Sequence, residues 1–203
     1  MHIPENTAPE YLDLPLGEFL DRVASDSPAP GGGSVAAVAV ALAAGLAGMA
    51  ARLSSAQLAE APELASQADA ARLRVAPLAM ADATSYGRVL EAYREPDPEA
   101  RRERVRDALS GAADVPLAVA EAGNEVAGLA SRLVEEGNPN LEGDALAALL
   151  LAGAGVRAAA KLVEINLSTA GVDDDRLAQA NWLVDTTAEG VPRKGADERD
   201  RGL

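Results

Sequence analysis

A stretch of 21 residues, from Gly31 to Ala51, carries no charged side chain and consists mostly of alanine and glycine. A helix of this length could span a bilayer. However, alanine and glycine transfer weakly into lipid, no basic flank precedes the run, and no belt of aromatic residues surrounds it. A helix that is apolar on every side is typical of the centre of a helical protein. The run therefore predicts a buried central helix, over residues 35–54, in an all-α fold with no membrane partner.

The rest of the chain supplies the helices that would surround this core. Its 203 residues suffice for one domain with a real core, and only 2% of them are aromatic, so packing should rely on small side chains. Because no repeat or domain boundary is visible, we expect one domain over residues 1–203, a bundle of about six helices with flexible ends at 1–15 and 192–203. The expected helices cover residues 16–25, 35–54, 62–95, 98–135, 145–167 and 173–189. Two of them are nearly uncharged, which predicts that a second copy covers part of the surface.

Composition excludes several classes of function. A net charge of −14 argues against nucleic acid as a partner, because binding a phosphate backbone requires clustered lysines and arginines. The chain has no cysteine, and its single histidine is His2, so disulfides, thiolate chemistry, histidine triads and histidine-rich metal sites are excluded. The first residues carry no secretory signal pattern, and we expect a cytoplasmic protein without a metal. Acid–base chemistry must then be done by carboxylates.

A glycine-rich segment precedes the uncharged run, in the order Ser-Pro-Ala-Pro-Gly-Gly-Gly-Ser from Ser27 to Ser34. Consecutive glycines allow a sharp turn and expose several backbone N–H groups together. Ser34 is predicted to be the N-cap of a helix that begins at Val35, and the N-terminus of a helix attracts anions and polar oxygens. The Walker spacing is absent. The segment could hold a carboxylate, a phosphate or a polar heterocycle; the alternative is a tight turn where two segments pass closely.

Asp82 is the carboxylate that periodicity singles out. It occupies a position on the apolar stripe that continues through Leu78, Tyr86, Val89 and Tyr93. An acid on a buried stripe must be paired, hydrogen-bonded or shifted in pKa. Pro77 should kink this helix and open a cavity beside the acid. Asp82 is therefore predicted to carry out acid–base chemistry; the alternative is that it only fixes packing by accepting hydrogen bonds.

A second carboxylate, Asp144, follows a polar loop that contains Asn138 and Asn140. It stands where the N-cap of a helix from Ala145 is expected, and Asn166 lies near the end of that helix. Asp144 is interpreted either as a cap alone or as a cap that also faces a ligand.

Five blocks of sequence resemble the cyclodeaminase/cyclohydrolase family of folate one-carbon enzymes, and the resemblance extends over residues 16–185. One block by itself is a weak signal, but all five occur in the family's order. The blocks are Pro30–Ser34, Asp82–Tyr86, Ala113–Leu117, Gly137–Asn140 with Asp144, and Ile165–Leu167.

The resemblance implies an all-helical homodimer that acts on tetrahydrofolate carrying a one-carbon unit at N5 and N10. It implies Asp82 as the general acid and base, and no metal or redox cofactor. The residues that it implies around the reduced folate are Gly31, Gly32, Gly33, Ser34, Asn138, Asn140, Asp144 and Asn166. Two reactions stay open at this point. A formimidoyltetrahydrofolate cyclodeaminase closes the methenyl bridge and releases ammonia, whereas a methenyltetrahydrofolate cyclohydrolase opens that bridge with water.

The chain also departs from the family pattern. Where the family commonly has a lysine, a serine, an asparagine and a basic residue, this chain has, in that order, Gln57, Gly143, Leu162 and Glu164. They motivate an alternative in which the chain is a catalytically reduced member that binds folate or only assembles with a partner. A further alternative is a structural bundle with no ligand.

Overall fold

The computed structural model describes residues 10–189, which form α-helices and two short 3-10 turns without a strand. The all-α prediction is confirmed. The elements are η1 (Tyr11–Asp13), α1 (Leu16–Val23), α2 (Gly32–Arg52), α3 (Ala61–Val75), α4 (Leu78–Ala92), α5 (Pro98–Gly111), α6 (Asp114–Glu136), η2 (Pro139–Leu141), α7 (Glu142–Ala170) and α8 (Asp175–Glu189).

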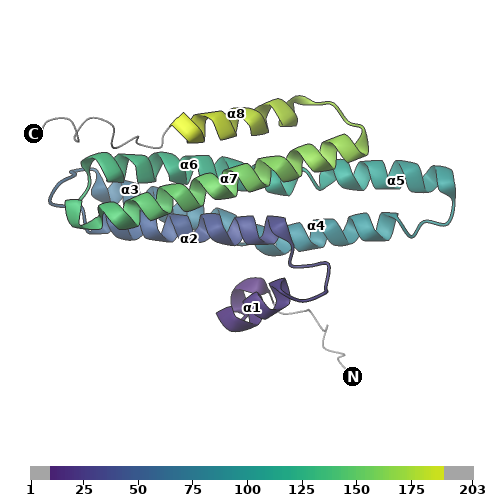
Figure 1. Cartoon of the computed structure of the whole chain (residues 1–203), viewed down its shortest axis with the longest axis horizontal. Coiled ribbons are helices and arrows are strands. Elements are labelled where there is room, and N and C mark those ends of the chain that lie inside the picture. Colours follow the sequence, from purple (N-terminus) through teal and green to yellow (C-terminus); the bar gives the residue numbers. More distant parts are fainter. Residues whose placement is uncertain (1–9, 190–203) are drawn as a thin grey trace, which may run out of the picture.

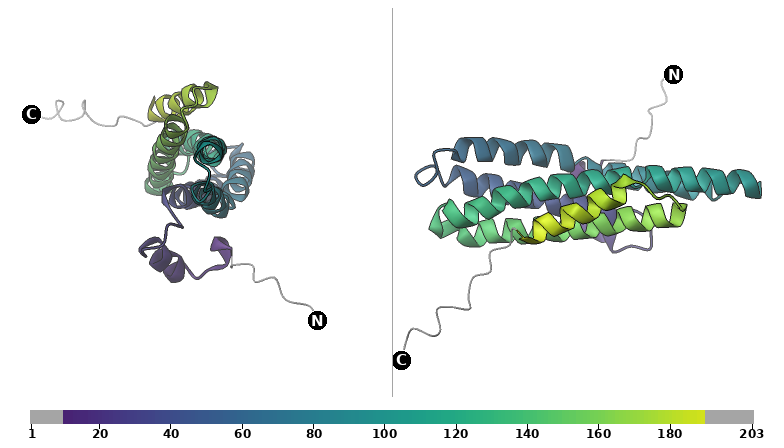
Figure 2. Two further views of the ribbon diagram at one scale, coloured as in Figure 1. Left: turned by 90° about the vertical axis from the view of Figure 1, so that its right-hand side faces the viewer. Right: turned by 90° about the horizontal axis from the view of Figure 1, so that it is seen from above.

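Helix α2 forms the centre of the bundle, as its uncharged sequence predicts. It packs against α3, α6 and α7, while α8 lies along α6 and α7 (Figure 1). Its inward face is mostly alanine, with Val40 fully buried at the contact with α7. Helices α4 and α5 form an antiparallel pair that projects beyond one end of the bundle, and α1 lies outside it on the side of α2 (Figure 2).

Two predicted long helices are each interrupted, so that six expected helices appear as eight segments. The expected helix over 62–95 ends at Val75 and restarts at Leu78, because Pro77 has no N–H to continue the first helix. The expected helix over 98–135 breaks at Ala112 and Ala113, because Pro116 cannot donate to the carbonyl of Ala112 four residues earlier. A kink was expected at each proline; the structure has a full break.

Two helix starts also differ from prediction. Helix α2 begins at Gly32 with Gly31 as its N-cap, so Ser34 is the third residue of the helix and does not cap it. Helix α7 begins at Glu142, so Asp144 likewise lies inside the first turn. In both cases the helix extends further toward the N-terminus than the serine or aspartate indicated. The 3-10 segment η2 leads directly into α7, whereas α2 starts after Gly31, whose backbone is extended.

The segments Gly32–Arg52 and Pro139–Ala170 are long and apolar enough to cross a membrane by length and composition. In the most apolar stretch of each, 56% and 50% of the residues are buried inside the bundle, as in the core helices of a helical domain. Of the ends expected to be flexible, residues 10–15 contain η1, where Tyr11 packs edge-to-face on Phe19 of α1 with ring centroids 5.8 Å apart. Residues 1–9 and 192–203 lie outside the described residues.

Candidate active site

The carboxylate of Asp82, on α4, lies against the first turn of α2. The backbone N–H of Ser34 donates to Asp82 Oδ2 at 2.9 Å, across 48 positions of sequence. The first N–H groups of a helix have no partner within the helix, and the N-terminus carries a partial positive charge. The anion that the start of α2 attracts is therefore the protein's own Asp82.

The hydroxyl of Ser34 contacts two acceptors but has only one proton. Its Oγ lies 2.7 Å from the carbonyl oxygen of Ala79 and 3.1 Å from Asp82 Oδ2. The hydroxyl can therefore donate to only one of these oxygens at a time, whereas the backbone N–H of Ser34 always donates to Asp82 Oδ2.

Burial raises the pKa of Asp82 above its ordinary value of 3.8, because desolvation disfavours the charged form. The two hydrogen bonds from Ser34 act in the opposite direction and are the smaller effect. Asp82 therefore keeps a proton at a higher pH than an exposed aspartate. A carboxyl group whose pKa is raised is better suited to general acid and base chemistry than an exposed aspartate is.

Gly33 allows the carboxylate to come this close. A Cβ at position 33 would lie 2.0 Å from Asp82 Oδ1, and no real pair of atoms tolerates that distance. Among the described residues, Oδ2 receives both contacts from Ser34, whereas Oδ1 accepts none. Gly33 is thus required by close approach, and Oδ1 is the oxygen left for a ligand.

A cavity of about 300 Å³ opens beside this carboxylate. The glycines at 31–33 form one wall, α4 contributes Ser85 and Tyr86, and α7 contributes Ile165 and Asn166. The cavity is mostly apolar, and its polar groups are the carboxylate of Asp82, the amide of Asn166, the hydroxyls of Ser85 and Tyr86, and the backbone of the glycines. A few convergent polar groups in an apolar hollow are typical of a small-molecule site.

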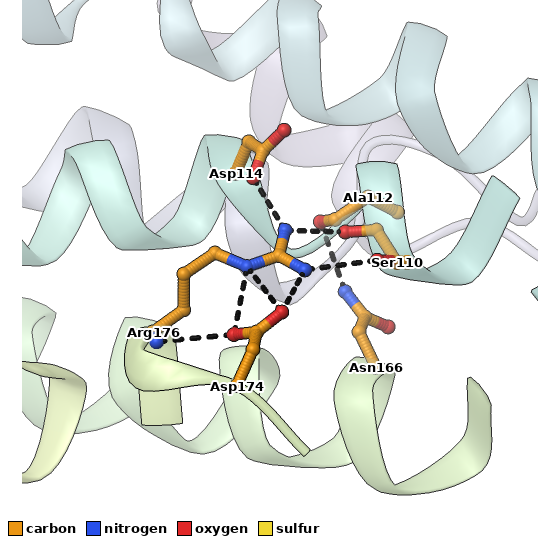
Figure 3. A network of polar contacts seen from close by, with 6 residues as sticks. All are labelled: Ser110, Ala112, Asp114, Asn166, Asp174 and Arg176. Atoms are coloured by element: carbon orange, nitrogen blue, oxygen red, sulfur yellow. Dashed lines mark hydrogen bonds and ion pairs between the residues drawn. The ribbon is translucent and has the colours of Figure 1, made fainter. Parts of the chain in front are cut away.

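A polar network holds the wall of this cavity where α5 meets α6 (Figure 3). Asn166 Nδ2 donates at 3.0 Å to the carbonyl of Ala112, which Pro116 leaves without a donor from its own helix. Arg176, at the start of α8, donates to the carbonyl and hydroxyl oxygens of Ser110 at 2.8 Å each, and it pairs with Asp114 at 2.5 Å. Asn166 and Arg176 thus tie α7 and α8 to the break between α5 and α6.

The structure brings most of the sequence-predicted residues together. The cavity is lined by Gly31, Gly32 and Gly33 together with Asp82 and Asn166. Ser34 donates its backbone N–H to Asp82. The side chain of Asn166 is committed to Ala112 through its amide nitrogen, which leaves its carbonyl oxygen for other contacts.

The loop of Asn138, Asn140 and Asp144 is not brought to this cavity within one chain. Asn138 donates its backbone N–H to Ser54 Oγ at 2.9 Å and its amide to the carbonyl of Leu53 at 3.0 Å. These partners follow the C-terminal end of α2, about 30 Å from Asp82 at the helical rise of 1.5 Å per residue. The expected single pocket, lined by both the glycine segment and this loop, does not form in one chain.

Three of the four departures from the family pattern lie away from the cavity. Gln57 and Gly143 are exposed at the far end of α2 and at the start of α7. Glu164 forms an ion pair of 2.7 Å with Lys161 on its own helix. Leu162 is the exception, because its side chain lines the cavity wall.

Sequence reasoning missed several residues of the site. Tyr86 was expected on a buried stripe, but it is 44% exposed and borders the cavity. Nothing local marks Ala112, whose partner lies 54 positions away. Arg176 pairs with its neighbour Asp174, but its contacts with Ser110 and Asp114 cross more than 60 positions. The one available signal was Pro116, because a proline inside a helix frees the carbonyl four residues before it.

Comparison with known proteins gives a consistent result. The model of the family "Formiminotransferase-cyclodeaminase" matches residues 15–181. A methenyltetrahydrofolate cyclohydrolase of Methylorubrum extorquens is 34% identical over 172 residues, which span 79% of this chain and 82% of that protein. The crystal structure of a formiminotetrahydrofolate cyclodeaminase from Thermotoga maritima is similar with a TM-score of 0.75 and 30% identity, covering 90% of this chain and 98% of the other.

Proposed function

Because the chain belongs to the formiminotransferase-cyclodeaminase family, we propose that it is a folate one-carbon enzyme that acts at the carbon between N5 and N10 of tetrahydrofolate. The observation that carries the proposal is Asp82, a carboxylate with a raised pKa that faces the cavity beside the glycine turn. Gly31, Gly32, Gly33 and Asn166 would contact the reduced folate, and Ser34 would position Asp82.

As a cyclodeaminase, the enzyme would use Asp82 twice. N10 attacks the carbon of the protonated formimino group, whose nitrogen carries two protons, and Asp82 Oδ1 takes the proton that N10 loses. Asp82 then returns this proton to the resulting amino nitrogen, which leaves as ammonia while the cationic methenyl bridge forms. One carboxyl group is sufficient because it ends the cycle in the state in which it began.

As a cyclohydrolase, the same carboxylate would act on water. Asp82 takes a proton from the water that attacks the methenyl carbon, and it gives that proton to N5 as the ring opens to 10-formyltetrahydrofolate. The second proton of the water is released to solvent. This reaction is kept as a second candidate because the relative from Methylorubrum extorquens carries that name.

The test is turnover of each substrate by the pure protein. With 5-formiminotetrahydrofolate, a rise in methenyl absorbance with equimolar ammonia identifies a cyclodeaminase. With 5,10-methenyltetrahydrofolate, loss of that absorbance faster than the uncatalysed rate identifies a cyclohydrolase. Absence of both signals contradicts the proposed activity.

The departures from the family pattern do not argue strongly for a catalytically reduced protein, because only Leu162 reaches the cavity. If both assays fail, a thermal shift with the same folates separates the remaining alternatives. A raised melting temperature would favour the reduced folate-binding member, and no shift would favour a bundle without a ligand.

A second copy of the chain is the proposed partner of an exposed apolar face. On α2 this face consists of Val35, Leu42 and Met49, which repeat every seven residues, and Leu42 is 60% exposed. On α1 the leucines at 16 and 20 point away from the bundle. Light scattering should give twice the chain mass for the wild type and one chain mass for Leu42→Glu. Leu73→Glu, at an exposed leucine of α3, is the matched control and should stay dimeric.

A dimer also offers the only route by which Asn138, Asn140 and Asp144 can contact the folate, because one chain keeps them about 30 Å from Asp82. We keep their substrate-binding role on that condition. Mixing an inactive Asp82→Asn chain with an inactive Asp144→Asn chain would then restore turnover in mixed dimers. Full activity of Asp144→Asn alone would contradict the role.

The remaining expectations concern the surroundings of the enzyme. A reduced folate carries the one-carbon unit itself, so we propose no metal or redox cofactor for this chemistry. A cytoplasmic location, and the absence of membrane and nucleic-acid partners, stay predictions from composition. Fractionation of the native cell tests the location.

A further inference from the structure

A second hollow, of about 650 Å³, lies further along the same two helices that line the Asp82 cavity. On α4 the lining continues from Tyr86 to Tyr93, and on α7 it continues from Ile165 to Thr169. Steps of seven and four residues keep these side chains on one face of each helix. The second hollow thus begins about 16 Å from Asp82, at the rise of eleven helical residues.

Exposed aromatic and apolar side chains line the neighbouring parts of both hollows, Tyr86 and Ile165 in the first and Tyr93 in the second. Tyr86 is 44% exposed, Tyr93 is 53% exposed and Ile165 is 47% exposed, although all three stand on helices that pack into the domain. Exposed aromatic side chains in a row offer stacking surfaces for a flat ring. They match the middle part of a folate, which is an aminobenzoyl ring.

The second hollow is basic in a strongly acidic protein. It is lined by Arg101, Arg102 and Arg106 of α5, together with Glu99 and Glu103, so three positive charges face two negative ones, whereas the whole chain carries −14. Arg102 has no ion-pair partner among the described residues, and Arg106 makes only a contact of 3.4 Å with Asp107. Arginines in this state can bind carboxylates.

We propose that this hollow is the subsite for the glutamate carboxylates of the folate tail, with the aminobenzoyl ring lying over Tyr86 and Tyr93. The proposal rests on the proposed function, since it assigns the far end of the same substrate. Asp82 at one end and the arginines at the other would fix the direction in which the folate lies between α4 and α7. The arginines of α5 would also supply the positive charge that is missing at Gln57 and Glu164.

The experiment compares substrates that differ only in the tail. Whichever substrate turns over in the assay above is prepared with no, one and three glutamates, and kcat/KM is measured for the wild type and for the double variant R102A/R106A. The control is R104A, on the same helix, because Arg104 pairs with Glu95 at 2.5 Å and lines a different hollow. Circular dichroism checks that the variants fold.

The wild type and R104A should prefer the glutamylated substrates by about tenfold or more, and R102A/R106A should lose most of that preference. Raised salt should weaken the preference in the wild type, because the contact is between exposed charges. An unchanged preference in R102A/R106A would overturn the tail subsite and leave the proposed function intact. No turnover of any substrate by the wild type would overturn both.

Discussion

The two ends of helix α2 have similar contacts but differ in the chemical group that they bind. At each end a fully buried serine meets a distant segment: Ser34 contacts Asp82, and Ser54 accepts the backbone N–H of Asn138. At each end a glycine makes the contact possible, because a Cβ on Gly33 or Gly137 would lie within 2.5 Å of another atom. At one end the partner is a carboxylate, and at the other it is a backbone amide.

Within one chain, this difference in partner decides which end holds a site. An amide N–H that donates to Ser54 has no further capacity, so this contact leaves no group for a ligand within that chain. A carboxylate has two oxygens, and Oδ1 of Asp82 stays available beside a cavity. Buried serines, glycines and helix ends are therefore structural by themselves, and the group that meets them brings the chemistry.

Asp82→Asn should have the largest effect at the active end of α2. An amide cannot shuttle the proton, so kcat should fall by about 10²- to 10⁴-fold, the usual contribution of a general acid or base. Steady-state kinetics measures this effect, and folate binding should persist. Asp69→Asn is the control at the other end of α2, where Asp69 pairs with Arg52, and it should change kcat less than twofold. Wild-type turnover in Asp82→Asn would contradict the mechanism.

Gly33→Ala and Gly137→Ala each add one methyl group at one end of α2, and we expect different effects at the two ends. At 33 the methyl group collides with Asp82 Oδ1, so kcat/KM should fall about 100-fold as the carboxylate moves. At 137 it collides with the carbonyl of Leu133, so the free energy of unfolding should fall by about 1–3 kcal/mol. Turnover per folded molecule should be retained in Gly137→Ala. Equal loss of activity in both variants would show that the two ends do not differ in function.

Ser34→Ala and Ser54→Ala test the two buried hydroxyls. Ser54→Ala removes the acceptor of the Asn138 N–H and should cost about 1–3 kcal/mol of stability without changing kcat, as urea unfolding and kinetics would show. Ser34→Ala should lower the free energy of unfolding by about 1 kcal/mol. It should also move the pH profile of kcat, because Asp82 loses the hydroxyl hydrogen bond that lowers its pKa. A pH profile identical to wild type would remove Ser34 from the site.

The smallest effect is the pH dependence of stability. The folded pKa of Asp82 is raised, so between pH 3.8 and that raised value the folded protein holds a proton that the unfolded chain releases. Stability from this group therefore falls as pH rises through that window. Asp82→Asn lacks this dependence, and its melting temperature should rise relative to wild type from acid to neutral pH. A difference that is constant with pH would mean that the pKa of Asp82 is not raised.

The fold was predictable in outline, and particular residues show why. The uncharged run identified α2 as the core helix because an apolar surface on all sides must be covered. The helices that flank it followed from periodicity to within a few residues at most ends. The breaks before Pro77 and Pro116 were expected only as kinks, because sequence does not show whether a helix resumes on the same axis after a proline.

The amino-acid sequence by itself determined the all-α class, the buried central helix and Asp82 as the acid to examine, because periodicity reports burial within a single helix. Only the tertiary structure decided which distant groups meet. It placed Asp82 against Ser34 and Gly33, brought the Asn138 loop to Ser54, and placed the arginines of α5 around a second hollow. Contacts across dozens of positions depend on how helices pack after each break, and no local pattern encodes that packing.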